Sequence, residues 1–271
     1  MKRVGNRLTV PGHDERGDWI VKIAFDNYAD LCANEWVTMQ WARLAGFEVP
    51  ETELRVLSDL GGLLPEADPA TPVFAIRRFD RESAGDAPRP RRATTTRIHQ
   101  EDFQQVVGRE PSKKYDDITY EGVTLLAARI VGDDAYHEVL RRLAFVVASG
   151  NNDAHMKNWA IVYPDRIRAQ LSPLYDQVFT AYWPEFSVQM ALNLGGTKDF
   201  AAVTLARFRE LARRLGELPD QAETIVTDAM ERIAAGWAAV RDAPAVTDAY
   251  RAALRRHWQK VPLVQPYAAR L

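Results

Sequence analysis

The amino-acid sequence predicts an α+β protein with two lobes, a small lobe that carries strands and a larger lobe that is mainly helical. Two early runs, 19–25 and 73–79, are rich in β-branched and aromatic residues, as is typical of buried strands. Later in the chain the apolar residues recur at helical spacing instead. A stretch rich in Pro, Gly, Ser, Thr and Arg separates the two patterns, as is typical of a loop or linker. We therefore expect an N-terminal lobe at 1–79, a linker at 80–97 and a C-terminal lobe at 98–271.

Composition excludes several classes of protein. The chain has 271 residues, of which 46% are hydrophobic and 27% charged, so it is neither disordered nor fibrous. No apolar run reaches the roughly 18 residues that a bilayer requires, and the start Met1-Lys2-Arg3 leads into polar residues, so we expect no membrane segment and no secretory leader. Cys32 is the only cysteine, which excludes an intrachain disulfide and favours a cytoplasmic location. The net charge of -2 gives no global attraction to nucleic acid.

The predicted N-terminal lobe carries one lysine inside an apolar strand. Lys22 lies in the middle of the run 19–25, and a buried ammonium requires an anionic partner. The apolar spacing then predicts a helix over 31–45, which Gly46 ends. Glu35 lies in the first turns of that helix. The second strand follows at 73–79.

The predicted C-terminal lobe consists mostly of helices. Between two groups of helices, the apolar run 159–163 and a second run around Leu171 are separated by Pro164-Asp165-Arg166, which is typical of a small hairpin. The predicted helices are 100–107, 122–131, 135–149, 204–215, 221–240 and 247–258.

Polar residues that suit phosphoryl transfer are concentrated after the third of these helices. Asp153 and Asn158 lie five residues apart, and Asp176 follows eighteen residues after Asn158. Phosphoryl transfer needs one carboxylate to accept a hydroxyl proton, and an amide with a second carboxylate to hold Mg²⁺ against the phosphates of ATP. Lys22, held by Glu35, can point at the α- and β-phosphates. The four parts occur in the order found in kinases.

Each of these residues also has an ordinary structural interpretation. A strand lysine is often a snorkelling edge residue, a helix glutamate is usually solvated, and Asp153 and Asn158 are good helix caps. His155 is a candidate for proton transfer, but we favour a core histidine that orients the loop, because Asp153 already supplies a base. Lys157 is either a solvated loop residue or a cation that neutralises the transferring phosphoryl group, and we favour the second. Taken jointly, the ordered set favours the catalytic interpretation.

The same residues resemble a known family. The stretch 152–159, Asn-Asp-Ala-His-Met-Lys-Asn-Trp, and the stretch 171–176, Leu-Ser-Pro-Leu-Tyr-Asp, resemble the catalytic and metal-binding segments of HipA-like serine/threonine kinases. These kinases are the toxins of bacterial toxin–antitoxin systems. The other segments that agree, in order, are Asn34-Glu35 with 42–46, then 78–81, 99–105 and Lys113-Lys114-Tyr115.

The resemblance implies a two-lobed protein-kinase-like fold with ATP and Mg²⁺ in the cleft between a small sheet-bearing N-lobe and a mainly helical C-lobe. It makes Lys22 the ATP-phosphate lysine and Asp153 the catalytic base. It makes Asn158 and Asp176 the Mg²⁺ ligands. Backbone and side chains from Arg77 to Phe79 would form the hinge that touches adenine.

Two departures from the family concern nucleotide binding. No glycine-rich, serine-bearing loop is evident before Trp19, where Thr9 is the only hydroxyl residue, so we expect control by partner proteins rather than by a phosphorylated serine. In this respect the chain resembles HipT, the short kinase of three-component systems, in which a separate small protein resembles the missing N-terminal subdomain. Arg77 stands at a hinge position that is acidic in many relatives.

The resemblance also implies partners, and two other functions stay open. It implies a protein substrate, possibly an aminoacyl-tRNA synthetase, and an antitoxin with a helix-turn-helix through which DNA is contacted only indirectly. One alternative is a small-molecule phosphotransferase of the aminoglycoside type, and another is a non-catalytic pseudokinase that binds its antitoxin. The arginine-rich segment 77–97 is a solvated loop in the interpretation we favour, or else a docking surface. Trp183 and Phe186 are expected to serve packing, with a substrate groove passing nearby.

Overall fold

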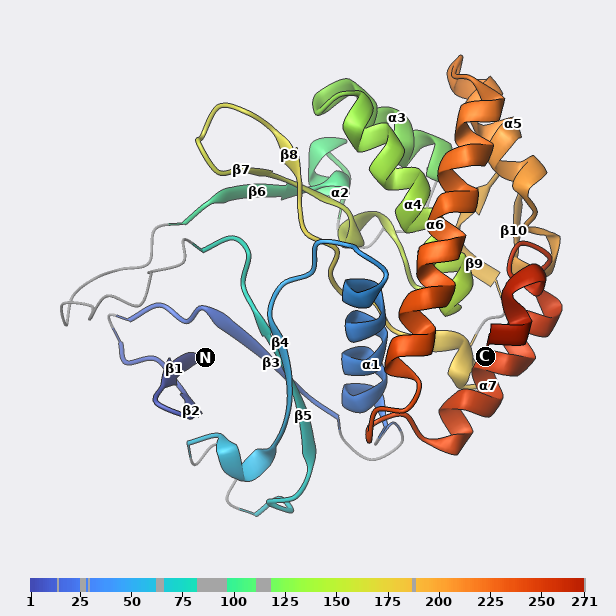
Figure 1. The fold of residues 1–271 in the computed structure, drawn as a ribbon. Coiled ribbons are helices and arrows are strands. Elements are labelled where there is room, and N and C mark those ends of the chain that lie inside the picture. Colours follow the sequence, from blue (N-terminus) through green and yellow to red (C-terminus); the bar gives the residue numbers. More distant parts are fainter. Residues whose placement is uncertain are drawn as a thin grey trace.

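A computed structural model shows the two-lobed α+β architecture that the sequence predicts (Figure 1). The structure describes residues 1–13, 15–24, 28, 30–61, 66–81, 97–110, 118–186 and 189–270. Most of the predicted linker, and the segment Lys113-Lys114-Tyr115, lie outside the described residues. No helix in these described ranges is long and apolar enough to span a bilayer.

A three-stranded antiparallel sheet forms the centre of the N-terminal lobe. Its order is β3 (Trp19–Ile23), β5 (Pro72–Arg77) and β4 (Thr52–Val56), with β5 in the middle and Lys22 opposite Phe74. Both predicted strands are present, each two residues shorter at its C-terminal end. Strand β4 was not predicted, although the charged Glu53 and Arg55 alternate with Leu54 and Val56.

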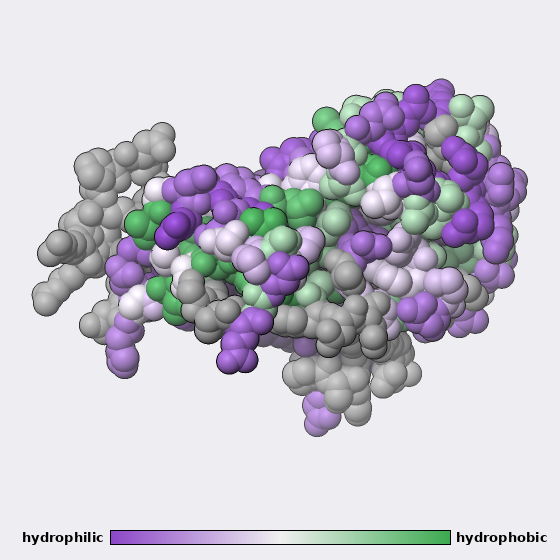
Figure 2. All heavy atoms as spheres, turned by 90° about the horizontal axis from the view of Figure 1, so that it is seen from below, coloured by the Kyte–Doolittle hydropathy of each residue, from purple (hydrophilic) through white to green (hydrophobic). Residues whose placement is uncertain are grey.

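A small hairpin covers this sheet at the N-terminus. Strands β1 (Lys2–Val4) and β2 (Arg7–Thr9) are joined through Gly5, whose φ of 60° suits glycine. Leu8 is fully buried and forms a bridge to Leu60. The surface view of Figure 2 shows apolar residues gathered toward this lobe, whereas the helical lobe is mostly hydrophilic on the same face.

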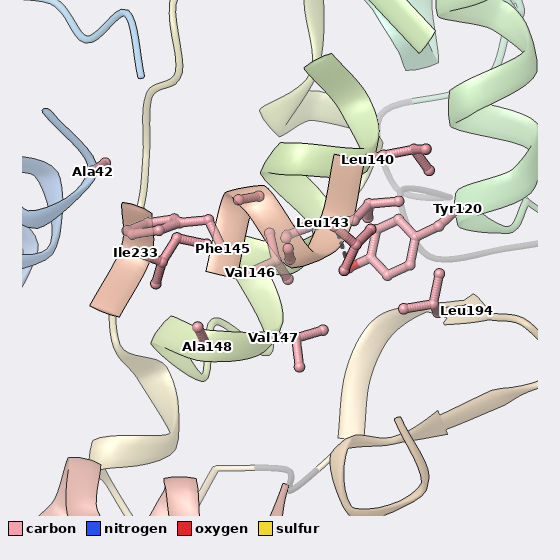
Figure 3. Close-up of a cluster of buried hydrophobic side chains, with 14 of the residues drawn as sticks. Ala42, Tyr120, Leu140, Leu143, Phe145, Val146, Val147, Ala148, Leu194 and Ile233 are labelled. Atoms are coloured by element: carbon pink, nitrogen blue, oxygen red, sulfur yellow. Dashed lines mark hydrogen bonds between the residues drawn. The ribbon is translucent and has the colours of Figure 1, made fainter. Parts of the chain in front are cut away.

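Helix α1 (Leu31–Leu44) joins the sheet to the helical lobe because two of its faces are apolar. Cys32 and Met39 pack against the sheet with Phe74. On the other face, the Trp41 indole lies 5.2 Å from the Phe145 ring and donates a 2.7 Å hydrogen bond to the Ile233 carbonyl. Figure 3 shows this main core, where side chains from α1, the helical lobe and β9 meet.

Longer helices pack around α4 in the described part of the C-terminal lobe, and most residues of α4 are buried. Each corresponds to a predicted helix, with ends displaced by at most two residues. A long helix, α6, packs against both α1 and α4, and Figure 1 shows it running past them. The helices are α3 (Tyr120–Ile130), α4 (Asp133–Ser149), α5 (Leu205–Leu215), α6 (Pro219–Val240) and α7 (Asp248–Lys260).

The prediction of one helix over 100–107 was wrong. Residues His99–Asp102 form strand β6, and only Phe103–Val106 form a helix, α2. Asp102 caps that helix through a reciprocal hydrogen-bond pair with Gln105, so the helix begins there, and the residues before it pair with β7 instead.

Two hairpins complete the lobe. Strands β7 (Ala160–Tyr163) and β8 (Gln170–Leu171) confirm the predicted hairpin and share a sheet with β6. Strands β9 (Gln189–Leu194) and β10 (Thr197–Asp199) were not predicted.

The contact between α1 and α6 supplies a first prediction. A Cβ at Gly236 would lie 2.7 Å from the backbone nitrogen of Ala45, so Gly236→Ala should push the helices apart and lower the free energy of unfolding by about 1–3 kcal/mol. Gly12→Ala is the control, because its Cβ would lie no closer than 3.8 Å to the Glu15 side chain, an ordinary contact, so this variant should keep the stability of the wild type. Urea unfolding of both variants measures the difference, and equal stabilities would contradict the close packing.

A second prediction concerns acid stability. The His257 ring bonds the Val147 carbonyl at 2.8 Å, and Trp258 donates to Ala148, so α7 caps the end of α4. Burial lowers the pKa of His257 to about 4, below its usual 6.5. Since the unfolded chain binds this proton first, stability is complete above pH 6.5 and falls as the pH drops toward 4, by on the order of 2 kcal/mol at pH 4.5.

His257→Gln keeps a donor but does not titrate. Chemical denaturation at pH 7.5 and pH 4.5 should therefore show a smaller acid loss for this variant than for the wild type. An identical loss would exclude His257 as a source of the acid sensitivity.

Candidate active site

Three charged side chains from distant parts of the chain meet at the centre of the site. The Lys22 ammonium on β3 lies 2.7 Å from Glu35 Oε1 on α1 and 2.5 Å from Asp176 Oδ1, which follows β8. The Glu35 side chain is almost fully buried, with 3% exposed, whereas those of Lys22 and Asp176 are about 40% exposed, at 38% and 40%. The strand, the helix and the later loop are thus held together by one ammonium.

The pKa values at this cluster reflect one cation between two anions. Burial alone would lower the pKa of Lys22, but the carboxylates of Glu35 and Asp176 raise it above its ordinary value. Burial raises the pKa of Glu35 to about 7, since it shares the ammonium with a second carboxylate. Burial also opposes ionisation of Asp176, yet Lys22 and the Asn158 amide hold its pKa below the usual range. The cluster has an excess of negative charge that suits a bound cation.

The backbone at Asp176 is fixed in an uncommon conformation. Its φ is 56°, a left-handed value that a non-glycine residue adopts rarely and often at functional sites. On one side the Tyr175 hydroxyl donates to the Lys157 carbonyl at 2.6 Å. On the other side Gln177 bonds the Tyr175 carbonyl and accepts from Asn151. These contacts attach the Asp176 segment to the loop that carries Asp153 and Asn158.

That loop begins where α4 ends at Gly150, whose φ of 62° reverses the chain. Asn151 accepts a hydrogen bond from the Asp153 backbone N–H at 3.0 Å, and the Asp153 side chain is left 49% exposed. The His155 ring is buried, with its Nε2 atom 3.9 Å from the Asp153 carboxylate. This placement suits a residue that orients the loop.

Asn158 connects the loop to Asp176. Its amide NH₂ donates to Asp176 Oδ2, and its amide oxygen accepts from the His155 backbone N–H at 3.1 Å. Coordination of a metal by Asn158 therefore requires the amide to turn its oxygen toward Asp176. Among the described residues no group of three or more His, Cys, Asp or Glu side chains forms a metal site, so an ion here would take ligands from this amide and carboxylate, phosphate and water.

A cleft of about 320 Å³ opens beside the charged cluster. Of the nine predicted site residues, six line it, while Asp153, His155 and Asn158 do not. Asp153 instead lines a second hollow, described below, so the loop 150–158 lies between the two. The described lining residues of the cleft are Ile20, Lys22, Glu35, Ile76, Arg77, Arg78, Phe79, Asp80, Gln100, Asp102, Lys157, Tyr175 and Asp176.

The predicted hinge, residues 77–79, presents an aromatic ring to the cleft, while two of its backbone N–H groups are already hydrogen-bonded elsewhere. The backbone N–H groups of Arg77 and Arg78 already donate to the carbonyls of Glu51 and Asp18, each at 2.8 Å. The Arg77 guanidinium lies 3.5 Å from the Glu51 carboxylate. The Phe79 ring, in contrast, lies 5.1 Å from the Tyr175 ring at the edge of the cleft. A flat aromatic base therefore finds stacking partners here.

Sequence reasoning missed the role of Asn34. This side chain is 2% exposed and makes two hydrogen bonds with the Phe179 backbone, donating to its carbonyl at 3.1 Å and accepting from its N–H at 2.8 Å. Because Glu35 is the next residue, adjacent positions of α1 hold Lys22 and the segment after Asp176. A polar residue on a helix face that is otherwise buried was the available signal.

Known proteins with similar sequences show the family of this chain. The sequence model of the HipA-like C-terminal domain matches residues 5–237. The chain belongs to this family. The Sinorhizobium fredii protein Y4dM, named as a kinase, is 35% identical over 245 residues, which cover 87% of this chain and 55% of that protein. The serine/threonine-protein kinase toxin HipA of Shewanella oneidensis is 27% identical over 193 residues, 65% of this chain and 40% of HipA. The chain spans about half the length of such relatives.

Solved structures agree on the fold. HipA in the Shewanella oneidensis complex of HipA, HipB and operator DNA superposes with a TM-score of 0.73 at 20% identity, over 94% of this chain and 57% of HipA. The Helicobacter pylori proinflammatory kinase CtkA superposes with a TM-score of 0.55 at 16% identity, over 93% of this chain and 90% of CtkA. The protein-kinase-like fold is therefore shared with both.

The Asn34 contacts supply a third prediction. Asn34→Ala leaves the buried N–H and C=O of Phe179 without these partners, so it should lower the free energy of unfolding by about 2–3 kcal/mol and speed backbone exchange around Phe179. Gln40→Ala, on the same helix, removes one half-buried bond to Thr52 and should cost about 1 kcal/mol or less. Hydrogen exchange read by mass spectrometry distinguishes them, and equal exchange around Phe179 would contradict the assigned role of Asn34.

Proposed function

We propose that this protein is an ATP- and Mg²⁺-dependent serine/threonine protein kinase. The observation that carries the proposal is the ion-paired ammonium of Lys22, held by Glu35 and Asp176 at the wall of an open cleft. Phosphoryl transfer relies on positioning and on compensation of the phosphate charge, and it needs little covalent chemistry from the protein. A fixed lysine, two candidate metal ligands and an exposed carboxylate across the loop meet these needs.

Each residue then has a defined role. Lys22 binds the α- and β-phosphates while Glu35 fixes its direction, and adenine stacks near Phe79 beside Arg77. Asn158 and Asp176 would hold Mg²⁺, which offsets the negative charge of the β- and γ-phosphates. Asp153 accepts the proton of the acceptor hydroxyl. The hydroxyl oxygen forms a bond to the γ-phosphorus, and the bond between that phosphorus and the ADP oxygen breaks. Lys157, which lines the cleft, stabilises the transferred group, and the buried His155 orients the loop.

The two alternatives fit the site less well. An aminoglycoside is polycationic, whereas Lys198 lies among the residues that line the hollow beside Asp153 and would repel it. A pseudokinase does not need Lys22, Asp153, Asn158 and Asp176 together, and all four are present in an ordered arrangement.

The partners proposed here follow from relatives. The structure of HipA in a toxin–antitoxin complex with HipB and operator DNA supports an antitoxin partner for this chain. The proposed antitoxin has a helix-turn-helix that contacts DNA, so that the kinase contacts DNA only indirectly. A separate small protein that covers the N-terminal lobe is a second proposed partner. The proposed substrate is a cytoplasmic protein of translation such as an aminoacyl-tRNA synthetase.

The assignment of the base supplies a fourth prediction. Asp153→Asn keeps the shape of the side chain but cannot accept the proton, so transfer of labelled γ-phosphate to lysate proteins should fall by at least roughly 10²-fold. Asp165→Asn, in the exposed turn of the β7–β8 hairpin, is the matched control and should keep wild-type transfer. Comparable transfer by Asp153→Asn would refute the base, and absence of transfer by the wild type to any protein would refute the kinase function.

A further inference from the structure

The second hollow, of about 470 Å³, lies against the exposed side of Asp153. We call it the acceptor groove. It shares no described lining residue with the cleft that holds Lys22, so an occupant would approach Asp153 from the side opposite the nucleotide. The described lining residues are Asn152, Asp153, Thr180, Phe186, Gln189, Met190, Ala191 and Lys198.

One part of the acceptor groove is apolar and firmly supported. Met190 and Ala191 belong to β9 and are buried against the main core. Phe186 is 37% exposed, and its ring lies 5.3 Å from Tyr28 and 5.8 Å from Trp183. Phe186 therefore supplies the exposed apolar surface of the groove, and an apolar side chain placed on it loses contact with water.

An irregular hairpin brings a cation to the same groove. Strands β9 and β10 pair Thr197 with Leu194 and then Asp199 with Gln189, so Lys198 alone faces several residues of β9. Such bulges redirect side chains and are common next to active sites. The Lys198 ammonium donates to the Ala191 carbonyl at 3.0 Å, and no carboxylate of the described part of the chain pairs with it. Among the described residues, two of its three N–H donors have no partner and are available to a ligand.

Polar side chains suited to a peptide backbone line the same groove as the cation and the base. Asn152 and Gln189 carry amides, and Thr180 carries a hydroxyl that already joins the loop 150–153 to the segment after Asp176. The groove therefore combines an apolar wall, amide groups and one cation around an exposed carboxylate. A free polycation would meet repulsion from Lys198, whereas an acidic polypeptide would not.

We infer that the acceptor groove binds an extended segment of the protein substrate that carries a Ser or Thr, an apolar neighbour and an acidic residue, and that Lys198 selects the acidic residue. The inference rests on the proposed kinase function. The hydroxyl lies at Asp153, the apolar side chain packs on Phe186, and the carboxylate pairs with Lys198. The substrate class is thus an acidic, partly apolar segment around the modified hydroxyl.

The test uses the purified full chain with Mg²⁺-ATP and a library of synthetic peptides, each with one central Ser or Thr and one varied flanking position. Lys198→Gln keeps a donor for the Ala191 carbonyl but removes the charge, and Lys198→Glu reverses it. Arg168→Glu is the matched charge reversal, since that side chain is 85% exposed on the β7–β8 turn and lines neither hollow.

The wild type and Arg168→Glu should prefer Asp or Glu at one flanking position by roughly fivefold or more. Lys198→Gln should lose this preference, and Lys198→Glu should prefer Lys or Arg at the same position. Transfer with unchanged preferences in both Lys198 variants would overturn this inference alone. Absence of transfer by the wild type to every peptide and every lysate protein would overturn the kinase function and this inference together.

Discussion

The active-site geometry depends on the ammonium of Lys22, which lies between Glu35 and Asp176. The three residues come from the sheet, from α1 and from the segment after β8, so their contact fixes three elements relative to one another. One positive charge between two carboxylates leaves the cluster short of positive charge, and burial raises the cost of that imbalance. The proposed nucleotide with its metal would supply a cation for the carboxylates and phosphates for the lysine. The excess negative charge, which is unfavourable when the site is empty, therefore favours binding of the proposed ligand.

Helix α1 transmits this constraint to the rest of the molecule. Glu35 holds the lysine, and the neighbouring Asn34 holds the Phe179 backbone. The helix itself is held by Trp41 in the main core and by the close approach of Gly236 at its end. The loop 150–158 is fixed from the other direction, because α7 caps α4 immediately before Gly150. Rigid attachment on both sides suits a reaction that depends on positioning.

The sequence was most informative where chemistry restricts the residue type. Five residues could be singled out because phosphoryl transfer uses those chemical groups and because they occur in the order found in kinases: Lys22, Glu35, Asp153, Asn158 and Asp176. The structure joins Lys22, Glu35, Asn158 and Asp176 in one hydrogen-bonded cluster. Residues whose importance comes from long-range pairing could not be recognised. The segment 100–102 contains good helix formers, yet it pairs as a strand with β7. The two hydrogen bonds between Asn34 and the Phe179 backbone depend on a partner far along the chain. The position of Lys198 depends on a register shift between β9 and β10, which the sequence pattern does not reveal.

The central claim is that Asp176 binds the metal that accompanies ATP while it also holds Lys22. Calorimetric titration of ATP at increasing free Mg²⁺ tests it directly, with the wild type compared with Asp176→Asn, which keeps the shape of the side chain but not its charge. The account predicts that Mg²⁺ strengthens ATP binding to the wild type and that this enhancement falls by roughly tenfold or more in the variant. Equal enhancement by Mg²⁺ in the two proteins would contradict it.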